Sequence, residues 1–204
     1  VSKKAWKKGG SKMFININTM VSVEDLIRGI IVQSGNDACI AIAEGISGSE
    51  ALFAEELNLL AKEIGMINSS FTNSTGWPDP DHLTTIQDLL TLTVRTIEDF
   101  PELYYYYAEK EFTYSGIRQL NRNPLLFNEI NADGLKTGHT SLGGYGLVAS
   151  VLKNNRRLIL ILNGLKRNKD RSNESERLIK VGFNQYKVID LYDKNQTITN
   201  LQVW

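Results

Sequence analysis

Cysteine, histidine and net charge are scarce in this sequence, and each scarcity excludes a kind of site. The single cysteine, Cys39, cannot form a disulfide within the chain, so cysteine usage does not distinguish a reducing from an oxidising compartment. The two histidines, His82 and His139, have no regular ligand spacing with carboxylates or with Cys39, so we expect neither a metal nor another cofactor. Basic and acidic residues number 23 each, so no overall field favours a nucleic acid as partner.

Long apolar runs are missing as well. The longest apolar stretches, residues 146–152 and 158–162, are far too short to cross a bilayer, and we recognise no signal peptide. A phosphate-binding glycine loop and a basic stripe with aromatic residues are not found, and the lysines within residues 3–8 are typical of a solvated loop. The 204 residues, 42% of them hydrophobic, are enough for one globular domain with a substantial core and part of a second.

The first half of the chain has the periodicity of amphipathic helices. Ser22 precedes Leu26 and Ile30 at helical spacing, and Asn36 or Asp37 can cap the next helix. In a third helix, which Gly65 ends, we expect five apolar side chains to face the core: Leu52, Phe53, Leu57, Leu60 and Ile64. The predicted helices cover residues 22–33, 36–45, 49–64, 84–100 and 173–181.

The second half of the chain changes to strands. Segments 135–140, 145–152 and 157–162 are joined by short turns, and the pair Asn154-Asn155 tolerates the positive φ of a tight hairpin. The sequence therefore predicts an antiparallel meander and a mixed α+β fold. Apolar and polar residues alternate again at residues 188–192 and 197–199, which predicts further strands. We therefore expect one partial domain over residues 1–187 and the truncated start of a β-rich domain over residues 188–204.

Three local features have a simple structural interpretation. Residues 73–80 are dense in turn formers, which predicts an ordered surface loop of the kind that often rims a site. The four tyrosines of residues 104–107 are interpreted as partly buried packing rather than as a carbohydrate platform. Cys39 lies in an apolar helical run, where we expect a small buried thiol and not a nucleophile.

Two short motifs carry the candidate chemistry. Lys136, Thr137 and Gly138 lead a predicted strand edge with a cation, a hydroxyl and a position without a side chain, where a peptide backbone can lie close. The second motif, Ser34-Gly35-Asn36, falls in the predicted loop between two helices. Either motif alone occurs by chance in many proteins. Their order, their spacing and their structural contexts agree with one another, so the combination is far more specific.

With these motifs the chain resembles the serine D-alanyl-D-alanine carboxypeptidases, which are low-molecular-weight penicillin-binding proteins of the bacterial envelope. The likeness covers residues 1 to about 187, and residues 188–204 resemble the start of the β-rich C-terminal domain of that family. It implies a β-lactamase/transpeptidase-like fold with a helical subdomain and an antiparallel sheet. Beyond the two motifs, the segments that carry the likeness are residues 29–39, 109–114, 116–123 and 148–150.

The resemblance implies a penicillin-sensitive reaction through an acyl-enzyme. A serine nucleophile would attack the bond between the last two D-alanines of a peptidoglycan stem pentapeptide, and water would release the shortened peptide. Ser34 would relay a proton to the leaving amine, and Lys136 would supply positive potential. Asn36 would hydrogen-bond the substrate amide or the catalytic lysine. His139 is expected to contribute its backbone N–H to an oxyanion hole.

A carboxypeptidase must also recognise a free terminal carboxylate, which calls for a hydroxyl and a guanidinium. The family resemblance makes Thr137 and Arg171 the candidates for direct contact, with Arg122 nearby and Gly138 allowing close approach of the substrate backbone. The alternatives are that Arg171 is a solvated loop charge and that Arg122 is a structural ion-pair partner.

The nucleophile motif of the family, Ser-x-x-Lys, is not found where it is expected. It precedes the other two motifs in this family, and the chain opens at Val1 with no room for it. Residues Ser150 and Lys153 match the pattern literally, but they lie on a predicted strand, where side chains three apart point to opposite faces. We therefore expect a trimmed chain that is inactive by itself. A β-lactamase relative and a non-catalytic envelope-binding or scaffold protein are the alternatives.

The resemblance also implies a location and partners. The expected location is the cell envelope, either the periplasm or the outer face of the cytoplasmic membrane. The expected partners are the peptidoglycan stem peptide and, for the full-length enzyme, β-lactam antibiotics as covalent inhibitors. Membrane contact is expected only through an anchor that is not present in these residues.

Overall fold

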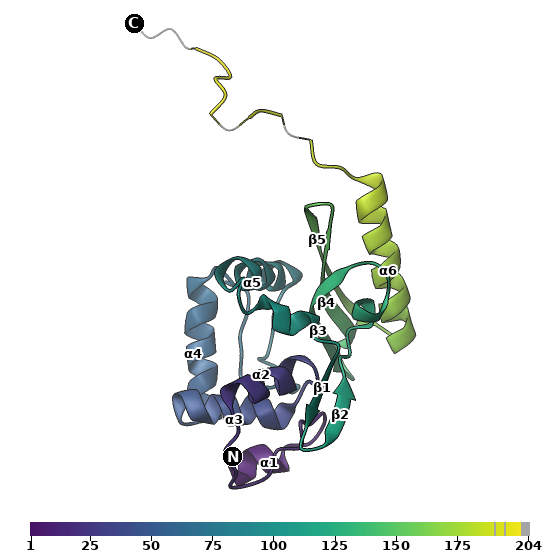
Figure 1. The fold of residues 1–204 in the computed structure, drawn as a ribbon. Helices are drawn as coiled ribbons and strands as arrows, with labels where there is room; N and C mark the ends of the chain where they lie inside the picture. The colour runs from purple at the N-terminus through teal and green to yellow at the C-terminus, as the bar shows by residue number, and fades with distance from the viewer. Residues whose placement is uncertain (190, 194, 201–204) are drawn as a thin grey trace, which may run out of the picture.

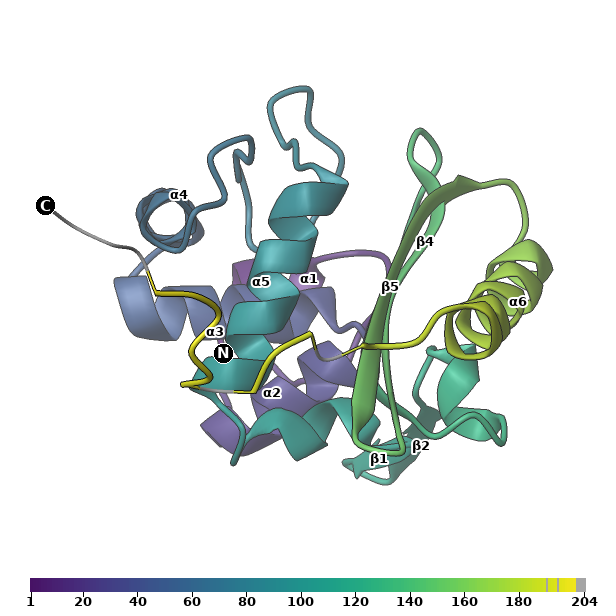
Figure 2. The same ribbon diagram turned by 90° about the horizontal axis from the view of Figure 1, so that it is seen from above.

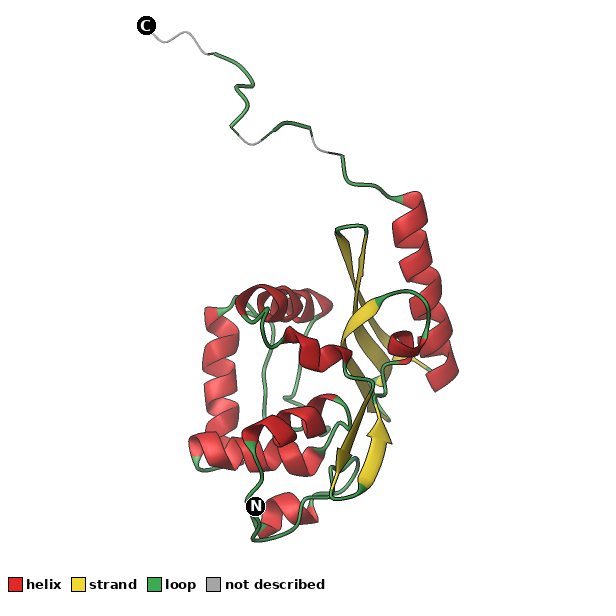
Figure 3. Ribbon diagram, in the orientation of Figure 1, coloured by secondary structure: helices red, strands yellow, loops and turns green. Residues whose placement is uncertain are grey.

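The computed structural model describes residues 1–189, 191–193 and 195–200, which form a helical part beside a sheet part (Figure 1). Helices and strands are coloured separately in Figure 3. The helices are α1 (Lys3–Lys7), α2 (Val23–Ile31), α3 (Asn36–Ser47), α4 (Glu50–Glu63), α5 (Ile86–Asp99) and α6 (Asn168–Gln185). The strands are β1 (Glu111–Tyr114), β2 (Ile117–Leu120), β3 (Ala132–Thr140), β4 (Gly144–Lys153) and β5 (Arg156–Leu165), and the 3-10 helices are η1 (Tyr104–Ala108) and η2 (Pro124–Phe127).

The predicted antiparallel meander is present, with strand order β3-β4-β5. Lys136 pairs with Val148 across β3 and β4, and the β4–β5 turn places Asn154 and Asn155 at φ values of 51° and 57°. Viewed from above, α6 covers one face of this sheet and helices α1 to α5 lie on the opposite side (Figure 2). The core beneath α6 consists of Leu125, Leu147, Ala149, Val151 and Ile179. The mixed α/β fold class expected from the sequence is confirmed.

The helix starts predicted near residues 22, 49 and 84 are confirmed for α2, α4 and α5. The side-chain oxygens of Ser22, Ser49 and Thr85 accept hydrogen bonds from backbone N–H groups in the first turn of their helices. The start of α3 differs from the prediction, because Gly35 is its N-cap. Asp37 instead turns its buried carboxylate to residues 13–15, from which it accepts three backbone hydrogen bonds.

The inward face predicted for α4 is wrong at two positions. Leu52 and Leu60 are 50% and 52% exposed, whereas Ala54 and Ala61 are buried. Apolar residues occur around much of this helix, so periodicity alone does not select the stripe that packs. The helix packs against α3, and its buried apolar side chains are alanines, whereas Leu52, Leu59 and Leu60 are exposed.

The last helix begins earlier than predicted. Residues 168–172 were expected to be a loop, but α6 starts at Asn168 and runs for 18 residues. Its first turns are strongly polar, which conceals the helix from a search for apolar periodicity. The buried positions Arg171, Ser175 and Ile179 follow one another at intervals of four, so a single face of α6 packs against the sheet and the cleft.

Past α6, the described residues form neither helix nor strand and lead away from the body of the molecule (Figure 1). The strands predicted at 188–192 and 197–199 are therefore not found among the described residues, and Asp190 lies outside them. Val188 and Leu191 are exposed, and a strand needs a neighbour to pair its backbone. The proposed domain boundary after residue 187 stays a prediction.

The short helix α1, the β1–β2 hairpin and the 3-10 helix η2 were not predicted from the sequence. The tyrosine run forms η1, in which Tyr104 and Tyr106 are buried, and this confirms their packing role. Within the described part of the chain, none of the helices combines the length and the apolar character needed to span a bilayer.

Candidate active site

Ser34 lies in the tight turn between α2 and α3, and its backbone is fixed on both sides. It adopts a φ of 54°, in the left-handed region that a serine rarely occupies. The backbone N–H of Gly35 donates to the carbonyl of Gly29 over 2.9 Å, and that of Asn36 donates to the carbonyl of Ser11 over 2.8 Å. The turn therefore holds the Ser34 hydroxyl in one direction.

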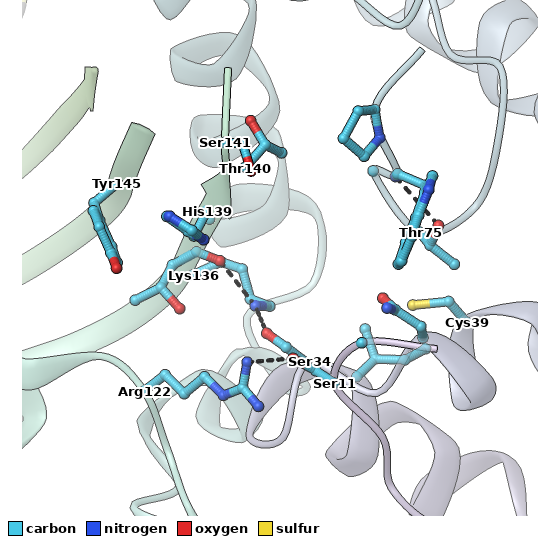
Figure 4. Close-up of a pocket in the computed structure, with 18 of the residues that line it drawn as sticks. Ser11, Ser34, Cys39, Thr75, Arg122, Lys136, His139, Thr140, Ser141 and Tyr145 are labelled. Atoms are coloured by element: carbon cyan, nitrogen blue, oxygen red, sulfur yellow. Dashed lines mark hydrogen bonds between the residues drawn. The ribbon is translucent and has the colours of Figure 1, made fainter. Parts of the chain in front are cut away.

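Lys136 reaches this hydroxyl from the other part of the molecule. Its Nζ donates to Ser34 Oγ, 102 residues earlier in the chain, and to the carbonyl of Thr137 over 3.0 Å (Figure 4). The two motifs predicted from the sequence thus meet across one hollow. Ser34 comes from the helical part and Lys136 from strand β3, so the site depends on how these parts pack.

Ser34 and Lys136 lie in a cleft of about 840 Å³. In Figure 4, His139, Thr140 and Ser141 lie on one side of it and Thr75 lies on the other. The loop predicted to rim a site therefore does so. All the site residues named from the sequence line the cleft: Ser34, Asn36, Arg122, Lys136, Thr137, Gly138, His139 and Arg171.

The loop that forms one side of the cleft is organised by Asn73. Its Oδ1 accepts from the backbone N–H groups of Thr75 and Trp77, over 3.1 and 2.9 Å, and its Nδ2 donates to the carbonyl of Trp77. The Lys8 ammonium lies 4.1 Å from the centre of the Trp77 ring. Such a side chain-to-backbone network holds an indole at the cleft edge although it is 44% exposed.

Asn36 occupies the first turn of α3 and presents its amide to the cleft. Its Nδ2 donates to the carbonyl of Gly9 over 2.9 Å. This contact fixes which way the amide points, and Asn36 is one of the residues that line the cleft. The opposite edge is strand β3, where a side chain at Gly138 would meet nothing within 4 Å, so the backbone there is open to a ligand.

Two arginines form the cationic end of the cleft. Arg122 donates to Ser11 Oγ over 2.5 Å, and Arg171 donates to Asn168 Oδ1 over 2.7 Å. Arg171 is only 6% exposed, and its Nε has no hydrogen-bond partner among the described residues. Its interpretation as a solvated loop charge is therefore wrong, because α6 carries it inward. Within the described ranges neither arginine forms an ion pair, which also removes the structural alternative for Arg122.

The charges of the cleft act on Lys136. Burial is the main cause that lowers its pKa from 10.5 to about 8, and the nearby guanidinium groups of Arg122 and Arg171 act in the same direction. Three cations gather in the cleft, and no carboxylate is found among the described residues that line it, so their mutual repulsion is not offset. An anionic ligand would relieve it, so the site is suited to a carboxylate.

Cys39 and the second Ser-x-x-Lys match do not compete for a catalytic role. Cys39 lines the cleft, and burial raises the pKa of its thiol to about 11, so it stays protonated. Ser150 is fully buried on β4, where its Oγ accepts a hydrogen bond from Arg157, while Lys153 lies at the far end of the same strand. In the described part of the chain, no cluster of metal-ligating side chains was found.

The structure adds residues to the cleft that sequence reasoning did not single out. Ser11 and Asn168 position the two arginines, and the Tyr145 ring lies 4.0 Å from that of His139. Trp77 had one signal in the sequence, since a large aromatic residue in a turn-rich loop is unusual. The others had none, because their roles come only from segments that meet in space.

A helical unit packed against an antiparallel sheet, with a serine and a lysine joined across the cleft between them, defines the penicillin-binding class of transpeptidase-like folds. Penicillin-binding protein 5 from Haemophilus influenzae superposes on the chain with a TM-score of 0.86 at 45% identity, covering 89% of this chain and 54% of that one. Penicillin-binding protein D2 from Listeria monocytogenes, solved in an ampicillin-bound form, gives a TM-score of 0.74 at 29% identity, covering 80% of this chain and 68% of that one.

The sequence comparisons name the same group. A family model described as D-alanyl-D-alanine carboxypeptidase matches residues 1–166. D-alanyl-D-alanine carboxypeptidase DacA of Haemophilus influenzae is 42% identical over 209 residues, which cover 100% of this chain and 53% of that protein. DacC of Escherichia coli is 41% identical over 211 residues, with coverages of 100% and 53%. The chain belongs to the D-alanyl-D-alanine carboxypeptidase family, and it spans about half the length of the curated relatives it matches.

Proposed function

We propose that this chain forms the substrate-recognition half of a serine-type D-alanyl-D-alanine carboxypeptidase that trims peptidoglycan stem pentapeptides. The observation that carries the proposal is the contact between Lys136 and Ser34 in a cleft that ends at Arg122 and Arg171. The cleft would combine a proton-relay pair with a site for a carboxylate. The reaction that we propose is that of the family to which the chain belongs.

In the proposed reaction, the nucleophilic serine Oγ bonds to the carbonyl carbon of the penultimate D-alanine, and the amide C–N bond breaks. The leaving amine of the last D-alanine takes its proton through Ser34, whose hydroxyl already accepts from Lys136. Water then hydrolyses the acyl ester and restores the serine. Asn36 and the open backbone edge at Gly138 hold the substrate peptide between α3 and β3.

The serine itself would come from a Ser-x-x-Lys helix of the complete protein. In the described part of the chain, Ser150 of the literal match is buried on β4 and Lys153 is exposed at the end of that strand, and neither residue lines the cleft. A helix that places both side chains on one face beside Ser34 would complete the site. Reading the gene upstream of the Val1 codon tests this directly, because the motif should be encoded before it.

The free terminal carboxylate would bind at the cationic end of the cleft. Arg171 has an unpaired buried Nε among the described residues, and Thr137 lies on the adjacent strand with its hydroxyl available. The His139 N–H would pair with that of the nucleophile to stabilise the oxyanion. Recognition of a carboxylate distinguishes a carboxypeptidase from an endopeptidase, whose substrate continues beyond the cut.

The decisive experiment uses the product of the complete gene with two substrates, a labelled penicillin and a stem pentapeptide. We expect a long-lived penicillin adduct together with release of D-alanine. Rapid turnover of the penicillin without D-alanine release would favour a β-lactamase relative. No labelling and no release would favour a non-catalytic envelope protein and would overturn the proposal.

The partners and the location follow from the same proposal. The peptidoglycan stem peptide would be the substrate, and β-lactams would act as covalent inhibitors of the complete enzyme, as the ampicillin-bound relative suggests. The site of action would be the periplasm or the outer face of the cytoplasmic membrane, within the cell envelope that the penicillin-binding relatives indicate. Separation of envelope and cytoplasmic fractions tests this location.

A further inference from the structure

Two buried asparagines flank Arg122 and have had no role so far. Asn123 is fully buried and Asn121 is 6% exposed, yet both are polar side chains at the start of an irregular segment. Burying an amide costs free energy unless its donors and acceptor are paired. Both amides are paired, and the partners they choose lie in segments that carry cleft residues.

Asn123 connects the Arg122 segment to strand β3. Its Oδ1 accepts from the backbone N–H of Leu125 over 3.1 Å and so caps η2. Its Nδ2 donates to the carbonyl of Gly134 over 2.8 Å. Gly134 lies two residues before Lys136 on the same strand, so this hydrogen bond sets the distance between the segment of Arg122 and that of Lys136.

Asn121 connects the same segment to helix α2. Its Oδ1 accepts from the backbone N–H of Asn123 over 2.9 Å, and its Nδ2 donates to the carbonyl of Glu109 over 2.9 Å. The Glu109 carboxylate in turn accepts from Arg28 Nε over 2.9 and 3.0 Å. Arg28 lies on α2, the helix that ends just before Ser34. One continuous network thus joins the supports of Ser34, Arg122 and Lys136.

The backbone of Arg122 is held between these two bonds, and its carbonyl also accepts a long hydrogen bond from Arg171, at 3.5 Å. Its guanidinium is therefore aimed into the cleft by its neighbours and not by an acidic partner. The geometry points to a division of labour. We propose that Asn121 and Asn123 are positioning residues that fix Arg122 relative to Lys136 and so shape the carboxylate-binding end of the cleft.

The first test reads the geometry in the 204-residue chain and needs no catalysis. Asn123→Ser keeps an oxygen that can cap η2 but is too short to reach Gly134, so it removes only the tie to β3. The matched control is Asn128→Ser at the other end of η2, where the amide donates to Glu176 on α6. The readout is the pKa of Lys136, followed by NMR of the labelled lysine side chain.

Without the bond from residue 123 to Gly134, Arg122 should move away from Lys136 and water should enter the cleft. Both changes should raise the pKa of Lys136 above its value of about 8. Besides Arg122, the charged or titratable groups that act on Lys136 are Arg171 and Cys39, and neither variant alters them. We expect an upward shift in Asn123→Ser and none in Asn128→Ser. An unchanged Lys136 pKa in Asn123→Ser, or equal shifts in both variants, would overturn the inference.

The second test rests on the proposed function and uses the product of the complete gene. Two substrates are compared, a peptide that ends in free D-alanine and an ester analogue whose leaving group lacks the carboxylate. For Asn123→Ser we expect a KM about fivefold higher with the free carboxylate, as for the loss of one hydrogen bond, and an unchanged KM with the ester. Asn128→Ser should leave both unchanged.

The outcomes separate the two proposals. Equal loss on both substrates would show a general structural role and overturn the positioning role. If the unmodified enzyme cleaves neither substrate, the proposed function fails, and the Lys136 pKa still decides the inference. Should Asn123→Ser not fold, Asn123→Asp keeps the shape and the bond from Leu125 but lacks the donor, and the substrate comparison should give the same selective rise in KM.

Discussion

At the scale of single residues, Lys136 shows how burial and charge together prepare a site. Its ammonium is placed among Arg122, Arg171 and the Ser34 hydroxyl, where solvation is poor and the neighbouring charges repel it. Burial and repulsion make the protonated form of Lys136 less stable, and the packing around it holds this cation at a fixed point. The same reasoning predicts what changes when the cation is removed.

Replacing Lys136 by alanine in the product of the complete gene should abolish D-alanine release, because no cation would then hold Ser34 in its relay position. We expect a fall of at least about 100-fold in kcat/KM, within the range of general acid–base contributions. Lys153→Ala is the matched control, since that lysine lies on β4 away from the cleft and should leave release unchanged. Normal release by Lys136→Ala would contradict the site assignment.

The pKa of Lys136 also predicts a pH dependence of stability. The folded-state pKa of about 8 lies below the ordinary 10.5, so between these values the unfolded chain binds the proton that the folded chain has lost. The free energy of unfolding should therefore increase as pH rises from 8 toward 10.5, so the folded protein becomes more stable over this range. Denaturant titrations of the native chain and of Lys136→Met measure this free energy. At pH 7 we expect the methionine variant to have the higher free energy of unfolding, and the difference between the two proteins should shrink as pH rises from 8 toward 10.5. A constant difference would count against the lowered pKa.

Asp37 is the buried acceptor that fixes the segment leading to the cleft. Its carboxylate accepts backbone hydrogen bonds from Met13, Phe14 and Ile15, the last at 3.2 Å. Asp37→Ala should lower the free energy of unfolding by about 2 to 4 kcal/mol, since it leaves buried donors unpaired. Asp25→Ala, at a partly buried position in the first turn of α2, should cost less than about 1 kcal/mol. Equal effects in thermal unfolding would refute the special role of Asp37.

At the scale of elements, the 73–80 loop takes much of its backbone pairing from the side chain of Asn73. Asn73 makes three hydrogen bonds with the backbone of Thr75 and Trp77, and the bonds from Ser74 to Glu50 hold the loop to α4. Asn73→Ala should therefore loosen the loop without unfolding the domain. Hydrogen exchange at the amides of Thr75 and Trp77 should accelerate about tenfold, and exchange within α5 should stay unchanged. Unaltered exchange at both loop amides would show that the loop is held in another way.

Helix α6 illustrates why element boundaries are hard to read from sequence. Its first turns consist of polar and charged residues, so a search for apolar residues at helical spacing detects only the later part of the helix. In the folded protein the buried face passes through Arg171 and Ser175, two polar residues, before it reaches Ile179. A polar residue on a buried helical face is a sign of function, and here it brings the guanidinium to the cleft.

At the scale of the whole molecule, the described chain is a compact body followed by an exposed segment. Residues from Tyr186 onward contribute exposed apolar side chains, including Tyr186, Val188 and Leu191, and none of the described ones joins a helix or strand. Trypsin should therefore cleave after Lys187 or Lys194 before it cleaves inside the body, and complete digestion of this segment should leave residues 1–187 with an unchanged melting temperature. Mass spectrometry identifies the first cut, and early cleavage inside the body would contradict the boundary after residue 187.

The starts of α2 and α4, the antiparallel meander and the two motifs could be predicted from the sequence, and the start of α5 to within a residue or two, because capping, alternation and turn chemistry act between neighbours along the chain. It could not determine which stripe of α4 packs, where α6 begins or that Arg171 is buried, because these depend on surfaces that meet only in the folded state. The tertiary structure alone decided that Ser34 and Lys136 touch and that Asn121 and Asn123 support the arginine beside them. Contacts between residues far apart in the chain are fixed by packing and by the need to pair buried polar groups, and local pattern does not record either.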